Sequence, residues 1–261
     1  MDFYGVLLAS KLNGGGGGSS VTVESLGVTE NGTYTAPTGK AYSPVTVNVG
    51  GGVPTGYTEC NYIQSNGDAY IDTGVFEVPN VFTGFSGRFA GKNESSGYKG
   101  IFGYQGAPQV SNFRFLVILQ ADNTIAYYSA SSGAGTLNGW NSDGVNDIEA
   151  TVYRSGSTYP EFKINGITQT GGKPRTTSYG NAAQGDMYLL AQNYQSGGPT
   201  TNEKEVDGSY LRCYGLKLYC YNALVRDFVP CVRNADSVPG FYDLCSDEFF
   251  PSIGGNAFTY G

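Results

Sequence analysis

The chain has 261 residues, of which 14% are charged, with a net charge of -7 and no histidine. This acidic balance without a basic cluster argues against a nucleic-acid partner, whose backbone is bound by concentrated Lys and Arg. The lack of histidine removes the commonest general base and metal ligand, which weakens every hydrolase hypothesis. The 40 Gly and 21 Tyr are typical of a turn-rich β protein of extracellular type.

Residues 1–20 are predicted to form an N-terminal arm and a glycine-rich linker. The arm has a helical spacing at Tyr4, Leu7, Leu8 and Lys11. It is too short to fold alone and needs a partner surface. An apolar segment on a glycine tether resembles the attachment arm of a virion appendage, which implies Phe3, Val6, Leu7 and Leu8 as attachment residues. The alternative is a frayed chain end.

Residues 21–52 are predicted to form a small β module with a glycine hinge. Two short β runs, at 21–23 and 45–49, flank a turn at Asn31-Gly32, where Asn-Gly supplies the positive φ of a tight hairpin. The segment resembles a small repeat of phage structural proteins. It buries too little surface to fold securely alone, so we expect it to oligomerise or to pack on a neighbour.

The rest of the chain alternates in short β runs, with no amphipathic stretch long enough for a major helix. Ten strands are expected, at 69–73, 81–89, 100–104, 113–119, 124–129, 147–153, 161–164, 187–192, 209–220 and 224–230. The apolar alternation slips within 209–220, which predicts a bulge at Tyr214-Gly215. Asn165-Gly166 predicts a tight hairpin. The sequence therefore indicates an all-β fold.

Four segments carry a family resemblance: 70–74, 216–219, 224–230 and 241–244. Together they look like the signature of laminin-G-like, concanavalin A-like jelly rolls in bacteriophage tail and fibre proteins and in bacterial surface proteins. The resemblance implies one jelly-roll β-sandwich over residues 57–261. It also makes Leu216, Leu218 and Phe228 expected core residues.

The five cysteines are an odd number without CxxC spacing, which argues against a disulfide framework or a zinc site. Buried free thiols are the expected state. No apolar run approaches the about 20 residues of a membrane span, so no membrane insertion is expected. The N-terminus has no secretory-signal pattern, which predicts assembly in the reducing cytoplasm of a host bacterium.

The spacing of one group of carboxylates is compatible with catalysis: Glu203, Glu205 and Asp207 would lie on one side of an extended strand. Their order differs from that of glycosidases on concanavalin A-like folds, and their flanks are loop-like. A solvated acidic loop is the preferred interpretation, so no catalytic residue is assigned.

The segment 141–147 places several oxygen ligands near a glycine, as calcium loops do. Many laminin-G-like domains bind calcium, so Asp143 and Asp147 are the candidate metal residues and calcium the candidate cofactor. Asn, Asp and Gly also make ordinary turns, and the turn is the preferred interpretation.

Aromatic residues beside amides are the better functional lead, because sugar rings stack on aromatic faces while amides bind their hydroxyls. The candidate glycan-binding residues are Tyr104, Gln105, Trp140, Asn141, Tyr179, Asn181, Asn193 and Tyr194. The alternative is that these rings belong to the core or to an interface.

The resemblance implies a non-enzymatic bacteriophage virion appendage that attaches to host-surface glycans and contacts other virion proteins. A homotrimer through the N-terminal region is expected, because weak sugar contacts gain strength by avidity. The alternatives are a purely structural decoration protein and a glycan-degrading enzyme. Fold alone does not choose among them.

Overall fold

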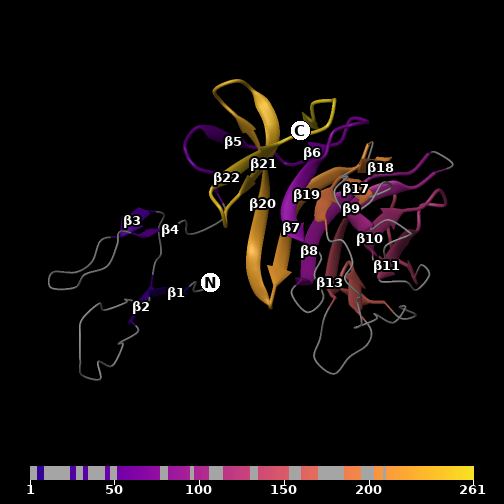
Figure 1. Ribbon diagram of the computed structural model, residues 1–261, viewed down its shortest axis with the longest axis horizontal. Coiled ribbons are helices and arrows are strands. Elements are labelled where there is room, and N and C mark those ends of the chain that lie inside the picture. The colour runs from indigo at the N-terminus through magenta and orange to yellow at the C-terminus, as the bar shows by residue number, and fades with distance from the viewer. Residues whose placement is uncertain are drawn as a thin grey trace. The chain divides into compact units, whose positions relative to one another are not determined.

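The computed structural model describes residues 5–8, 24–27, 32–34, 45–47, 52–76, 82–94, 97–105, 114–129, 135–152, 160–169, 185–194, 203–207 and 210–261. By its internal contacts the chain divides into two units, Met1–Gly52 and Val53–Gly261 (Figure 1). None of the described residues belongs to a helix long and apolar enough to cross a membrane.

The first unit contains two short antiparallel pairs among its described residues. Strand β1 (Gly5–Leu8) pairs with β2 (Glu24–Gly27), and β3 (Gly32–Tyr34) pairs with β4 (Val45–Val47). The helical interpretation of the arm is wrong for residues 5–8, because their backbone bonds to a second strand instead of to its own next turn. Phe3 and the run 21–23 lie outside the described residues.

The second unit is a β-sandwich of two mainly antiparallel sheets, and the prediction of an all-β fold is confirmed. Its larger sheet has eleven strands among the described residues. Eight follow the order β15 (Ile167–Thr168), β14 (Glu161–Ile164), β13 (Val145–Thr151), β8 (Phe82–Ala90), β19 (Arg212–Cys220), β20 (Ala223–Arg233), β21 (Val238–Asp243) and β22 (Glu248–Pro251). In addition, β5 (Tyr57–Glu59) pairs with β20, and β6 (Ile63–Gln64) pairs with both β19 and β23 (Thr259–Tyr260).

The second sheet has eight strands among the described residues. Six follow the order β12 (Gly135–Leu137), β11 (Ile125–Ser129), β10 (Arg114–Leu119), β9 (Lys99–Gln105), β16 (Asp186–Leu189) and β7 (Ile71–Phe76). Strand β17 (Ala191–Tyr194) pairs in parallel with β9 and antiparallel with β18 (Glu203–Asp207).

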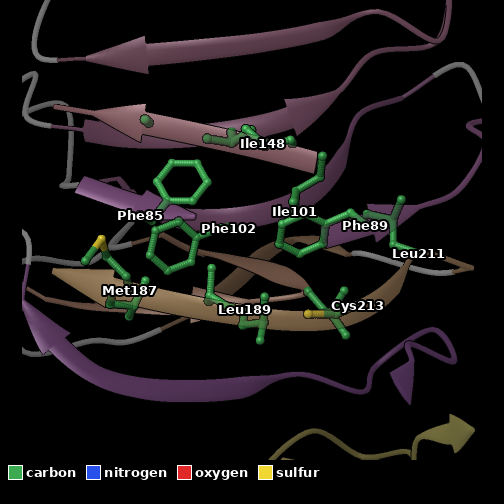
Figure 2. Close-up of a cluster of buried hydrophobic side chains, with 14 of the residues drawn as sticks. Phe85, Phe89, Ile101, Phe102, Ile148, Met187, Leu189, Leu211 and Cys213 are labelled. Atoms are coloured by element: carbon green, nitrogen blue, oxygen red, sulfur yellow. The ribbon is translucent and has the colours of Figure 1, made fainter. Parts of the chain in front are cut away.

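The core is rich in phenylalanine and is built from both sheets. Phe85 of the larger sheet lies 5.4 Å from Phe102 and 6.0 Å from Phe115 of the smaller one, measured between ring centroids. Figure 2 shows Phe85 beside Phe102, and also Met187, Leu189 and Cys213 among the buried side chains. Offset and edge-on ring contacts of this kind add to the free energy of burial.

Each of the ten expected strands overlaps an observed one. The segment 187–192 is divided into β16 and β17 at Leu190, whose φ of 64° is incompatible with a continuous strand. The sequence reasoning missed very short strands such as β5, β6 and β23, because two or three residues carry too little periodicity to be recognised.

Two local predictions are confirmed. The pairing of β19 with β8 shifts between Cys213 and Gly215, which is the expected bulge. It keeps Cys213 and Leu216 in the core although they are an odd number of positions apart along the strand, at which spacing a regular strand would place them on opposite faces. Asn165 and Gly166 both have positive φ, at 52° and 76°, as the type I′ hairpin between β14 and β15 requires.

The cysteines are free, as expected, but they are not all buried. Cys213 and Cys231 are buried, Cys60 and Cys220 are half-buried, and Cys245 is exposed. The prediction of buried thiols is therefore wrong for Cys245, which follows the end of β21 at the surface. Burial raises the pKa of Cys213 to about 12, so this thiol stays protonated and unreactive.

Candidate functional site

A groove of about 740 Å³ lies at one end of the larger sheet, within the range of about 300 to 1,000 Å³ usual for ligand sites. It is lined by residues 64, 90–92, 94, 99, 142–145, 210, 212 and 214. Five segments far apart in the sequence therefore meet around one hollow.

The strand register explains how these segments meet. Arg212 of β19 lies opposite both Gln64 of β6 and Ala90 of β8, and Ala90 lies opposite Val145 of β13. The next row, with Cys213, points into the core. Since successive residues of a strand face opposite sides, the row with Arg212 lies on the outer face of the sheet. The groove is therefore open to solvent.

Tyr210 stands at the groove with 68% of its surface exposed and a φ of 67°. A bulky residue rarely adopts this left-handed conformation, which costs of order 1 to 3 kcal/mol. Backbone bonds hold it there: Tyr210 N donates to Ser65 O at 3.0 Å, and Ser65 N donates to Leu211 O at 3.0 Å. The fold thus fixes the backbone from which an exposed aromatic side chain extends at the groove.

The guanidinium of Arg212 is held in place by two neutral partners. Its Nε donates to Gln64 Oε1 at 2.8 Å, and its Cζ lies 4.6 Å from the centroid of the Tyr62 ring. Tyr62 in turn packs against Tyr214, with 5.5 Å between ring centroids. These contacts restrict the rotamers of a long side chain, which lowers the entropy lost when it binds a ligand.

The turn at 141–145 forms another wall, and the buried amide of Asn146 locks it. Asn146 Nδ2 donates to Asn141 O at 2.8 Å and to Gly144 O at 3.3 Å. Its Oδ1 accepts from Asn141 N at 2.7 Å and from Asn165 Nδ2 at 3.1 Å. Trp140 supports the groove from its half-buried position, since its Nε1 donates to Gly91 O at 3.3 Å. Trp140 and Asn141 thus shape the site from behind its lining residues.

Of the two metal candidates, Asp143 lies in this turn and Asp147 lies on the strand β13 that follows it. Asp143 lines the groove, and its backbone N donates to Asn141 Oδ1 at 3.1 Å, as in an ordinary Asx turn. Asp147 is paired with Arg88, whose Nε is 3.4 Å away. Within the described part of the chain, no three His, Cys, Asp or Glu residues gather as a metal site would require. Calcium binding by Asp143 and Asp147 stays a prediction.

None of the glycan candidates is among the described residues that line the groove. Tyr104 and Asn193 lie opposite each other on β9 and β17, and both are 0% exposed. They are buried within a sheet and cannot meet a surface ligand, so the prediction of glycan binding is wrong for both. Gln105 and Tyr194 end the same two strands, with no description of their side chains. Tyr179 and Asn181 lie outside the described residues.

The acidic segment Glu203–Asp207 is strand β18 and not the loop that was expected. Its pairing with β17 shifts between Lys204 and Val206, which leaves Glu205 as the extra residue of a bulge. A bulge interrupts the strict alternation on which a carboxylate pair at Glu203 and Glu205 depended.

The sequence reasoning missed Gln64, Tyr210 and Arg212. A usable signal was present for two of them: Leu211 and Cys213 were assigned to the core face, so Tyr210 and Arg212 had to face outward. Nothing local indicated Gln64, which lies 148 residues from Arg212.

A second polar cluster lies outside the groove, where Asp72 of β7 and Asp186 of β16 share a hydrogen bond between their carboxyl groups. Burial raises the pKa of both groups. The charge of Asp72 and the shared hydrogen bond raise the pKa of Asp186 further, to about 6, although Arg226 opposes this. The two carboxyl groups therefore retain a proton to a higher pH than separate carboxyl groups would.

This carboxyl pair predicts a pH-dependent stability. Asp186 binds its proton more tightly in the folded state, so its contribution is fully present below about pH 4 and is lost as the pH rises through about 6. We expect Asp186→Asn to raise the melting temperature, relative to the wild type, more at pH 7.5 than at pH 4.5. Asp236→Asn is the control: because Arg233 lowers the pKa of Asp236 from 3.8, this carboxylate is ionised at both pH values, so the variant should lower the melting temperature by a similar amount at each. An equal shift at both pH values for Asp186→Asn would contradict the shared proton.

No protein-family model matches the chain, and no curated protein sequence does. Among solved structures, the chain is similar to the Ruminococcus gnavus IT-sialidase CBM40 bound to alpha2,3 sialyllactose, at 8% identity and a TM-score of 0.44 over 64% of this chain and 92% of that one. Domains LG4-5 of the mouse laminin alpha1 chain are similar at 10% identity and a TM-score of 0.38, over 76% of this chain and 52% of theirs. Trypanosoma rangeli sialidase in complex with sialic acid is similar at 13% identity and a TM-score of 0.40, over 62% of this chain and 27% of that one.

Proposed function

We propose that residues 53–261 form a non-catalytic glycan-binding domain whose site is the groove at Tyr210 and Arg212. The observation that carries this proposal is Tyr210, an exposed aromatic residue at the groove whose backbone is held by hydrogen bonds between Tyr210 N and Ser65 O and between Ser65 N and Leu211 O. Sugar rings present apolar C–H faces to such rings, and groups such as Gln64 and Asp143 bind hydroxyls. The combination suits a saccharide better than a wholly apolar ligand.

A matched pair of tyrosines tests this site. Tyr221 resembles Tyr210 in exposure, at 70%, and in its positive φ of 50°, but it lies at the turn between β19 and β20 and does not line the groove. We expect Tyr210→Ala to weaken glycan binding at least tenfold, or by about 1.4 kcal/mol, and Tyr221→Ala to leave it unchanged. A glycan array with the full-length protein identifies a ligand, and calorimetry on the two variants measures the difference.

The opposite results have distinct meanings. Equal losses in both variants would place binding outside the groove. No binding to any glycan by the wild type would favour the alternative of a purely structural decoration protein. Release of reducing sugars from a bound glycan would favour the third alternative, a glycan-degrading enzyme.

We further propose that the chain is a bacteriophage virion appendage, assembled in the host bacterial cytoplasm and bound to other virion proteins. The laminin-G-like signature at 216–219 and 224–230, and the apolar arm before a glycine run, support this proposal. Val6, Leu7 and Leu8 of the arm are the proposed attachment residues, together with Phe3. Deleting residues 1–18 should abolish incorporation into the particle and leave the sandwich folded.

A homotrimer through residues 1–52 completes the proposal. Short β pairs bury little surface by themselves, and three linked sites bind a glycan-coated surface more tightly than one. We expect light scattering of the full-length protein to give about three times the 27.6 kDa of one chain. A mass of one chain across micromolar concentrations would show that the chain does not associate away from a particle.

A further inference from the structure

The arginines of the second unit differ in their partners. Arg88, Arg226 and Arg233 each have a carboxylate oxygen nearby, at 3.4 Å on Asp147, 3.5 Å on Asp243 and 2.7 Å on Asp236. Within the described part of the chain, the hydrogen bond of Arg212 is to a neutral amide, and the face of its guanidinium lies against the Tyr62 ring. Arg212 is thus a positioned cation without a carboxylate partner among the described residues.

Arg233 is a useful comparison with Arg212, because its guanidinium also stacks on an aromatic ring. Its Cζ lies 4.8 Å from the centroid of the Phe249 ring. The guanidinium of Arg233 already binds a carboxylate: its Nε and one terminal nitrogen donate to Asp236 at 3.0 and 2.7 Å. In Arg212 the Nε is taken by Gln64, and the two terminal nitrogens are left to bind a further group. A guanidinium edge with two nitrogens matches the two oxygens of a carboxylate.

Two other cationic side chains, those of Lys92 and Lys99, line the groove together with Arg212. Lys92 is paired with Glu94, whose Oε1 lies 3.4 Å from its Nζ. Among the described lining residues the cationic side chains outnumber the anionic ones, Glu94 and Asp143, by one, although the whole chain has a net charge of -7. A local excess of cations attracts an anionic ligand.

We propose that the ligand of the groove is a sugar bearing a carboxylate, which the terminal nitrogens of Arg212 receive while Tyr210 stacks on the sugar ring. This inference rests on the proposed glycan-binding function and adds the chemical class of the saccharide. Gln64 and Tyr62 act by keeping the guanidinium in place, so little entropy is lost when the two charge-assisted hydrogen bonds form.

The test compares sugars that differ only in the charge of the carboxyl group. Trigalacturonate and sialyllactose, each beside its own methyl ester, are titrated into the full-length protein by calorimetry. We expect at least one of the two acids to bind at least tenfold more tightly than its ester. We expect Arg212→Gln to remove that difference, and Arg212→Lys to restore only part of it, since an ammonium is a point charge without the planar fork. Arg233→Gln is the matched control and should leave the difference unchanged.

Each result of these titrations either supports or overturns the carboxylate inference. Equal affinity for acid and ester, with binding that still depends on Tyr210, overturns the carboxylate inference and leaves the glycan-binding proposal in place. An acid preference that survives Arg212→Gln in a variant with unchanged melting overturns the role of Arg212. If neither these sugars nor any glycan of an array binds the wild type, the proposed function and the inference both fail.

Discussion

Replacing Phe228 by Ala is expected to lower the free energy of unfolding by about 3 to 5 kcal/mol, through lost burial and the cavity left behind. Phe228 is 1% exposed and contacts Phe241 and Phe250, at 6.2 and 5.1 Å between ring centroids. It lies on β20 opposite Leu216, so the change also removes a neighbour of β19. Denaturant unfolding of the purified protein measures the loss.

Leu224→Ala, on the same strand, is the control. Leu224 is 41% exposed, so its truncation should cost much less than that of Phe228. Near-identical unfolding of the wild type and the Phe228→Ala variant would show that the signature segment does not form the core of the sandwich.

Gly103→Ala is the second substitution with a large expected effect. Gly103 lies in the middle of β9, between β10 and β16, with a φ of 140° that side chains rarely adopt. A methyl group there would clash with the backbone carbonyl of Phe115 and with Leu116. Backbone strain of about 1 to 3 kcal/mol and overpacking of about 1 to 3 kcal/mol together predict a loss of about 2 to 6 kcal/mol in unfolding free energy.

Gly56→Ala separates the two causes. Gly56 has a φ of 103°, and an added methyl would meet no atom within 4 Å. This variant should therefore show the strain without the clash. If Gly103→Ala lowers the free energy of unfolding no more than Gly56→Ala does, β9 and β10 do not approach each other closely at Gly103.

Local sequence patterns were sufficient for much of the sandwich. The strand at 161–164, the bulge at Tyr214-Gly215 and the hairpin at Asn165-Gly166 were all predicted and are all present. Each depends on neighbours along the chain: alternation decides which face is buried, and Asn-Gly decides where the chain can reverse. The short β5, β6 and β23 were missed because pairing partners far along the chain, and not their own residues, make them strands.

The candidate site was the least predictable part. Asp143 was chosen from the sequence and lines the groove, while Trp140 and Asn141, also chosen, contact Gly91 and Asn146 beside it. Tyr104 and Asn193 were chosen for the same composition, yet they are buried side by side in a sheet. An aromatic residue beside an amide is compatible with either place, because burial depends on which strands lie next to it.

The sequence by itself determined that the chain forms β strands and where several of them turn, because these properties follow from neighbouring residues. The resemblance of its signature segments implied that Leu216, Leu218 and Phe228 face a core, and all three are buried. Only the tertiary structure decided that Gln64 meets Arg212 across 148 positions and that Tyr62 lies under its guanidinium. The physical reason is that the register between distant strands is set by the packing of the whole sandwich, which no local pattern encodes.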